Sequence, residues 1–210
     1  MRKLTTRLLL ISFLSVLIFS CKSYQIQGVT KKESPETVFK NHYFSNQETD
    51  YVYKAHIEIY GNPLGGIFVA KKINDTTHRV VFTTEFGNTL FDFELSDNSF
   101  KVNYIVADLD RKIIINTLKE DFRLLLKTNH KVQEVFENEA YIVYKSKDNK
   151  RYNYLFESKK DRKLIKLLHT SKTKEKVTYE FGSKSNTFAE NVTITHQNIK
   201  LKIELNQIIN

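Results

Sequence analysis

The feature that most restricts the fold of this chain is an alternation of apolar and polar residues. In its clearest run, near the end of the chain, Ile199, Leu201, Ile203 and Leu205 alternate with Lys200, Lys202 and Glu204. This period of two is typical of a strand with one buried face. Such runs recur between residues 51 and 106 and again between residues 132 and 205, separated by short turns. The pattern predicts about ten or eleven strands joined mainly as an antiparallel meander.

Two segments interrupt the alternation and predict helices. Ser34 is a favourable N-cap and Pro35 fits the first helical position, so a helix is expected at the start of the folded part. Residues 108–126 have apolar side chains at helical spacing, and residues 117–120 resemble a capping box. The β-branched run at residues 113–115 leaves an extended conformation open there.

A sheet with one apolar face must cover that face. It does so by curling on itself or by packing helices across the opening. We therefore expect a mainly β (α+β) fold, with a strongly curved antiparallel sheet and helices at its mouth. Such a sheet is large enough to enclose an apolar, ligand-sized cavity.

The N-terminus predicts a signal peptide. Arg2, Lys3 and Arg7 form a basic start, and the run 8–20 that follows is uncharged and mostly apolar. This run is shorter than the roughly 20 apolar residues needed to span a bilayer. We therefore expect residues 1–20 to be removed by a signal peptidase.

The lipid anchor is predicted at Cys21, the only cysteine in the chain. The sequence Ile18-Phe19-Ser20-Cys21 resembles a lipobox, and a lone thiol in an oxidising compartment is explained if it carries acyl chains such as palmitate. Residues 21–33 are then a lipidated tether, and residues 34–210 a single domain. No acidic run follows the cysteine, so we expect an anchor at the periplasmic face of the outer membrane.

Composition and motifs exclude several other classes. The formal net charge is +9, but the basic residues are spread along the chain and interleave with acidic ones. A nucleic-acid-binding protein is expected to cluster them. The six histidines are scattered without metal-ligand spacing, and His56 is expected to face solvent. No phosphate-binding loop or nucleophile elbow is present, so no metal, cofactor or enzymatic activity is expected.

The order of elements resembles the LolA/LolB family of lipoprotein carriers and acceptors. The segment Lys54–Leu95 is most similar to the LolB type, with Val80–Thr84, a glycine turn and Thr89–Leu95 following its pattern. The ending at Phe188–Leu205 is similar too. The resemblance implies an incomplete barrel with a helical lid, whose concave apolar face shelters acyl chains.

The resemblance also implies the site residues. In the LolB type, a turn before the fourth strand presents an exposed leucine that assists lipid transfer, and element order gives this place to Phe86. A literal Pro63-Leu64-Gly65 occurs two turns earlier, within a stretch at residues 61–66 that we expect to be a turn. The expected cavity residues are Ile57, Val69, Phe82, Phe91, Phe93, Leu201 and Ile203.

Two functions remain open. In the first, a membrane-anchored monomer binds lipid or lipoprotein acyl chains in its cavity, for example during lipoprotein sorting. In the second, the protein is a non-catalytic interaction module of the cell envelope, and the same apolar residues are only a packed core.

Overall fold

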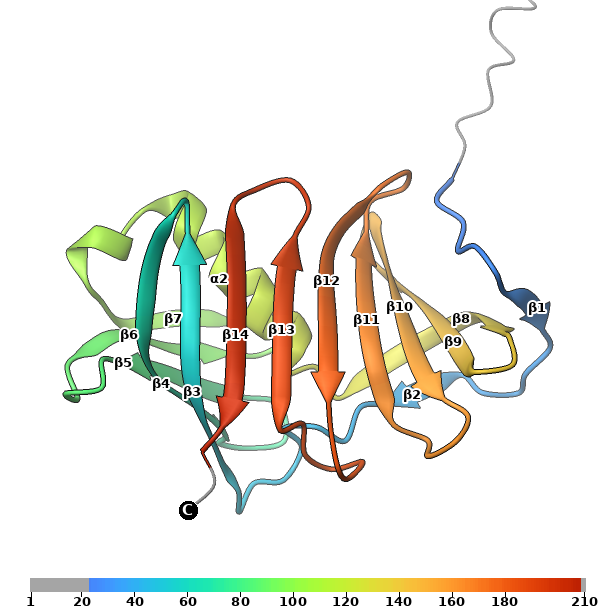
Figure 1. Ribbon diagram of the computed structural model, residues 1–210, viewed down its shortest axis with the longest axis horizontal. Helices are drawn as coiled ribbons and strands as arrows, with labels where there is room; N and C mark the ends of the chain where they lie inside the picture. Colours follow the sequence, from blue (N-terminus) through green and yellow to red (C-terminus); the bar gives the residue numbers. More distant parts are fainter. Residues whose placement is uncertain (1–22, 209–210) are drawn as a thin grey trace, which may run out of the picture.

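The computed structural model describes residues 23–208 and confirms the predicted fold class, a strongly curved, open antiparallel sheet with one α-helix (Figure 1). Fourteen strands lie within these residues, more than the alternation predicted. Cys21 and the signal peptide lie outside them. The strands in the first half of the chain are β1 (Thr30–Lys32), β2 (Val38–Lys40), β3 (Asp50–Ile59), β4 (Asn62–Lys72), β5 (His78–Thr83), β6 (Thr89–Leu95) and β7 (Phe100–Ile105).

A short 3-10 helix, η1 (Ala107–Leu109), and the α-helix α2 (Lys112–Leu125) separate the two groups of strands. The strands in the second half are β8 (Asn129–Glu137), β9 (Tyr141–Asp148), β10 (Arg151–Ser158), β11 (Leu164–Thr170), β12 (Glu175–Gly182), β13 (Asn191–His196) and β14 (Leu201–Gln207).

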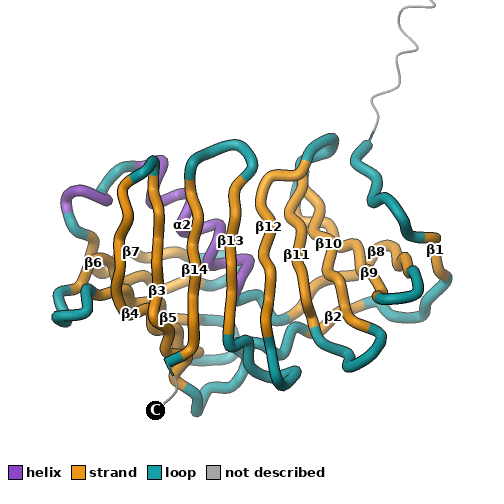
Figure 2. Tube along the Cα trace, viewed as in Figure 1, coloured by secondary structure: helices purple, strands orange, loops and turns teal. Residues whose placement is uncertain are grey.

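The sheet is continuous because the last strand pairs with one of the first. The order is β1-β8-β9-β10-β11-β12-β13-β14-β3-β4-β5-β6-β7, with β2 pairing separately with β8. In the β14–β3 pair, Ile203 lies opposite Ile57 and Leu201 opposite Ile59. Figure 2 shows how the strands wrap around one side of α2, which lies behind β13 and β14 in that view.

Helix α2 covers part of the concave face of the sheet. Its residues Leu118, Phe122 and Leu125 are fully buried, which matches the apolar spacing that predicted the helix. The Phe122 ring lies 5.2 Å from the Phe68 ring and 5.7 Å from the Phe91 ring, measured between centroids. The helix is therefore anchored to β4 and β6 by aromatic packing.

Two local predictions about helices were wrong. Ser34 does not cap a helix, because the chain continues into β2, where Phe39 packs on Tyr144 with a centroid distance of 4.9 Å. The expected capping box is interior to α2, and the Thr117 hydroxyl donates to the Ile113 carbonyl oxygen at 2.8 Å. The run at residues 113–115 is helical, because the burial of Ile114 and of the apolar residues after it outweighs the weak helix propensity of β-branched residues.

The expected turn at residues 61–66 is also shorter than predicted. Strand β4 begins at Asn62, and the chain reverses at Tyr60 and Gly61, which both have positive φ. Gly66 serves a different purpose inside β4. A Cβ atom there would lie 1.9 Å from the Thr83 carbonyl oxygen, so the glycine allows β4 and β5 to approach closely.

The expected tether packs against the domain from Tyr24 onward. The Tyr24 amide donates to the Lys172 carbonyl at 2.6 Å, and β1 pairs with β8. Tyr24, Ile26 and Val29 cover a second apolar cluster on the convex face of the sheet. The members of that cluster are Val143, Tyr154, Phe156 and Leu168.

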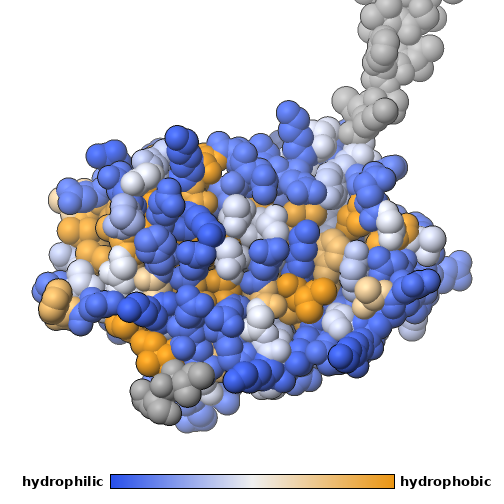
Figure 3. Space-filling view, in the orientation of Figure 1, coloured by the Kyte–Doolittle hydropathy of each residue, from blue (hydrophilic) through white to orange (hydrophobic). Residues whose placement is uncertain are grey.

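The rest of the convex face is predominantly hydrophilic, with scattered apolar patches (Figure 3). No helix within residues 23–208 is long and apolar enough to cross a membrane.

Candidate functional site

Most of the predicted cavity residues lie on the concave face but belong to a packed core. The rings of Phe91 and Phe93 stack at 4.7 Å, and the Phe82 ring lies 5.3 Å from that of Phe91. Helix α2 closes over them through Phe122. Six of the predicted residues are at most 4 % exposed: Ile57, Phe82, Phe91, Phe93, Leu201 and Ile203.

Val69 is on the opposite face, contrary to the prediction. It is half-buried and lies across from Val52 on β3 and Val81 on β5, both of which are also half-buried. The inward place on β4 belongs to Phe68, which lies opposite Tyr53 and is fully buried. Both faces of this part of β4 carry apolar residues, so alternation alone did not distinguish them.

An open groove lies beside this core, between α2 and the turns at one end of the sheet. Its volume is about 930 Å³, and none of the predicted cavity residues lines it. The walls come from α2, from strands β11 and β12, and from the β6–β7, β9–β10 and β13–β14 turns. Its apolar side chains include Ile113, Leu124, Val177 and Ile199.

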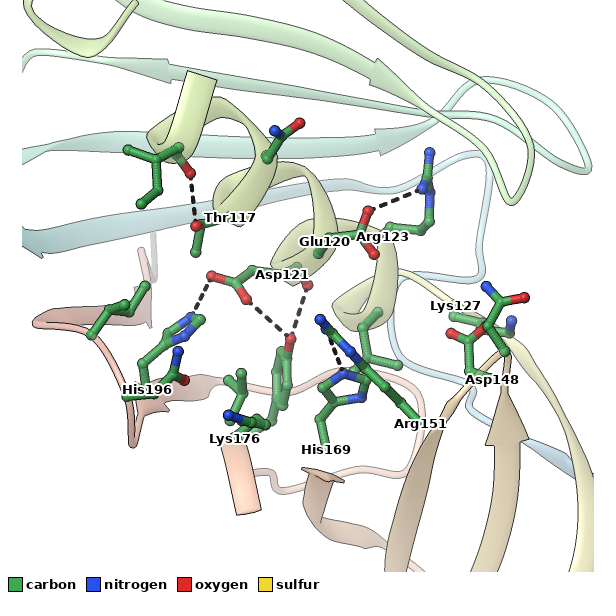
Figure 4. Close-up of a pocket in the computed structure, with 18 of the residues that line it drawn as sticks. Thr117, Glu120, Asp121, Arg123, Lys127, Asp148, Arg151, His169, Lys176 and His196 are labelled. Carbon is green, nitrogen blue, oxygen red and sulfur yellow. Dashed lines mark hydrogen bonds and ion pairs between the residues drawn. The ribbon is translucent and has the colours of Figure 1, made fainter. Parts of the chain in front are cut away.

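One wall of the groove contains a buried pair that joins the helix to the sheet (Figure 4). An Asp121 carboxylate oxygen on α2 lies 2.8 Å from Nε2 of His196 at the end of β13. The Tyr179 hydroxyl on β12 donates toward the Asp121 carbonyl at 3.4 Å and its carboxylate at 3.5 Å. Burial raises the pKa of Asp121, an effect that its bonds to His196 and Tyr179 partly offset. The pair is thus satisfied internally and fixes α2 against β12 and β13.

A second polar cluster lies beside it and presents a cation to the groove. Nε2 of His169 lies 3.2 Å from Nη1 of Arg151, and Nδ1 lies 2.6 Å from Oδ1 of Asn153. Because arginine can only donate, Nε2 must accept and Nδ1 must carry the proton. Burial, with a contribution from Arg151, lowers the pKa of His169 to about 4, so the ring is neutral at pH 7.

Strand register brings these groups together. His169 on β11 lies opposite Asn153 on β10 and opposite Val177 on β12, and Val177 lies opposite His196 on β13. A row that is mainly polar therefore crosses four adjacent strands on the concave face. No sequence motif predicts this row, because its members are many residues apart in the chain. Only the pairing of strands β10 to β13 brings them into line.

The charges lining the groove comprise five Lys or Arg and four Asp or Glu. Most of the carboxylates have partners: Asp121 contacts His196, Glu120 lies 3.4 Å from Arg123, and Asp97 lies 3.8 Å from Lys127. Arg151 forms no salt bridge with any carboxylate in the described part of the chain, and its side-chain hydrogen bond is to His169.

Phe86 lies away from the groove, on the β5–β6 turn, and is 95 % exposed. Sequence order predicted an exposed side chain here. Leu64 of the literal Pro-Leu-Gly is instead partly buried and packs on the main core. Of the two candidates for an exposed turn residue, the structure therefore presents Phe86.

The histidines do not assemble a metal site within residues 23–208, where no group of three or more His, Cys, Asp or Glu side chains is placed to hold an ion. His56 is exposed, as predicted. His78, His130 and His169 are buried.

Comparison with known proteins gives a distant structural similarity only. No family model and no curated protein sequence matches the chain. A crystal structure of a domain from Vibrio parahaemolyticus, described as an outer membrane lipoprotein-sorting protein domain, is similar over 76 % of this chain and 83 % of that one, with 8 % identity and a TM-score of 0.41. A similarity this distant assigns neither a family nor a function.

Proposed function

We propose that this protein is a membrane-anchored, non-enzymatic binder of a lipid or another acylated amphiphile, with a role in handling lipoproteins or lipids at the outer membrane. The observation that carries the proposal is the groove of about 930 Å³ with apolar and charged residues in its walls. Most of the side chains in its walls are polar or charged and the apolar ones lie on α2, β12 and the β13–β14 turn, which suits an amphiphile better than a wholly apolar ligand.

The proposal places the ligand in the groove and not beneath α2. The inner face between β3 and β7 is filled by aromatic rings and by Phe122. The groove is open and bordered by Ile113, which is 56 % exposed, and by Ile199, which is half-buried. An acyl chain that lies along these residues removes their apolar surface from water, which contributes about 25 cal/mol per Å².

The anchor is part of the proposal. Acyl chains on Cys21 hold the domain at the bilayer, because two or more buried chains give a stable attachment. The ring of Phe86 supports a contact with a membrane or an acylated cargo, since an aromatic side chain that is 95 % exposed within residues 23–208 is available to an apolar partner.

The proposal is tested by asking whether lipid remains bound to the protein during purification. Native mass spectrometry of the full-length protein purified from cells is expected to show co-purifying lipid, and a fluorescent fatty acid is expected to bind. Ile113→Asp places a charge on the apolar wall and should weaken uptake. Ile73→Asp, at another exposed position outside the groove, is the matched control. If the measured mass is that of the protein without lipid, and the fluorescent fatty acid does not bind, the proposal is contradicted.

The second candidate is an envelope interaction module that binds no lipid. It is favoured by the complete burial of Phe82, Phe91 and Phe93, which accounts for the apolar concave face by packing alone. Crosslinking in intact cells should then trap a protein partner while the groove stays empty.

A further inference from the structure

We infer that Arg151 anchors a phosphate head group in the groove, so that the amphiphile bound there is a phospholipid or lysophospholipid with its head at the β9–β10 turn. This inference rests on the proposed function and specifies the chemistry of its ligand. It starts from Arg151, an exposed guanidinium that makes no salt bridge within residues 23–208, although Asp148 lies opposite it in the β9–β10 pair. Lys112 and Lys176 also line the groove without a salt bridge in this part of the chain, but only Arg151 is held there by a buried side chain, that of His169.

The Arg151 guanidinium is held in place by the buried His169 side chain. His169 accepts its N–H at 3.2 Å and in turn donates to Asn153 at 2.6 Å, and both of these side chains are buried. A neutral imidazole is required for this arrangement, because a protonated ring has no lone pair to offer. Arg151 is therefore pre-oriented while its remaining donors stay free, which lowers the entropic cost of binding an anion.

The chemistry of those donors matches a phosphate. The guanidinium presents a planar fork of N–H groups, and two phosphate oxygens accept it in a bidentate arrangement. The position also suits a lipid, because Val177 lies directly across the β11–β12 pair from His169, and Ile113 and Ile199 line the same groove. A head at Arg151 thus leaves the acyl chain along the apolar wall.

His169 acts here as a positioning residue and makes no contact with the ligand in this scheme. Asn153 supports the ring from the other side, where its side-chain oxygen accepts from Nδ1 of His169. Asn153 does not itself line the groove, so its part in this scheme is to hold the His169 ring.

The experiment uses the full-length protein reconstituted in phosphatidylcholine vesicles. The vesicles contain either a photoactivatable phosphatidate or a photoactivatable diacylglycerol with the same acyl chains. After irradiation, labelling of the groove peptides that contain Ile113 or Val177 is measured by mass spectrometry. The variants are Arg151→Gln and its neighbour Lys150→Gln, which removes the same charge from the same turn but does not line the groove.

Phosphatidate is expected to label the wild-type groove at least about tenfold more than diacylglycerol, because only its phosphate accepts charge-assisted hydrogen bonds from Arg151. Arg151→Gln should remove this difference, and Lys150→Gln should leave it within about twofold, with circular dichroism spectra unchanged in both variants.

Equal labelling by the two lipids, or an unchanged Arg151→Gln variant, overturns the head-group assignment while the proposed function stands. If neither lipid labels the groove, both fail. Inorganic phosphate that raises the melting temperature of the wild type but not of Arg151→Gln, without lipid labelling, identifies a free-anion site and overturns the lipid source.

Discussion

The Asp121 carboxylate on α2 and the His196 imidazole on β13 lie 2.8 Å apart in a buried position, and they connect the helix to the sheet across the wall of the groove. The side chains are 3 % and 6 % exposed, respectively. Tyr179 closes the same cluster from β12. Helix α2, which forms one wall of the groove, is therefore held to the sheet both by aromatic packing at Phe122 and by this polar contact.

Removing His196 should be costly. His196→Ala leaves the Asp121 carboxylate buried without its imidazole partner, and breaking a buried pair in this way costs about 3–5 kcal/mol. Asp121→Asn keeps a side chain that can accept from the ring and should cost less. Urea denaturation of both variants measures the difference, and losses below about 1 kcal/mol in both would contradict the anchoring role.

Replacing His130 should reduce the acid sensitivity of the fold. Burial, with a contribution from Lys127, lowers the pKa of His130 to about 4, below its usual value near 6.5. The unfolded chain therefore takes up a proton that the folded chain resists, and stability is lost as pH falls from about 6.5 to about 4. His130→Leu removes this contribution, which is on the order of 2–3 kcal/mol.

The measurement is the free energy of unfolding at pH 7 and pH 4.5. The wild type should lose more stability between these values than His130→Leu, while the exposed His42→Leu should behave as the wild type. An identical pH dependence in wild type and His130→Leu would refute the assignment.

Phe122 should be the main apolar contact of the helix with the sheet. Phe122→Ala removes its contacts with Phe68 and Phe91 and should cost about 3–5 kcal/mol. Ile113→Ala, on the exposed side of the same helix, should change stability by less than about 1 kcal/mol. Comparable losses in both variants would mean that α2 is not held by its buried face.

Phe86 should matter for contact with membranes and not for folding. Phe86→Ser changes an exposed side chain and should shift the free energy of unfolding by no more than about 0.5 kcal/mol. Its adsorption to lipid vesicles should fall, whereas Phe86→Leu should retain most of it. Unchanged adsorption of the serine variant argues against the proposed contact.

The sheet could be predicted from the sequence because strand period is a local signal. Tyr53, Ala55 and Ile57 alternate with polar residues and all face inward in β3, and Phe91 and Phe93 do the same in β6. Helix α2 could also be predicted, because the helical spacing of its apolar residues is likewise a local signal. The helix predicted at Ser34 was wrong, because a serine followed by proline also suits a turn before a short strand such as β2.

The groove could not be predicted, because it depends on pairing and docking. Asn153, His169 and His196 become neighbours only through the register of β10 to β13. Asp121 joins them only once Phe122 has docked the helix. Val69 shows the same limit on one strand, since only pairing with β3 reveals which face of β4 points inward.

The most direct test is a crystal structure of the protein with a phospholipid whose acyl chain carries bromine, because anomalous scattering locates the bromine atom without assuming its place. We expect an anomalous peak in the groove near Ile113, Val177 and Ile199. A peak beneath α2, among Phe82, Phe91 and Phe93, or no bound lipid at saturating concentration, would contradict it.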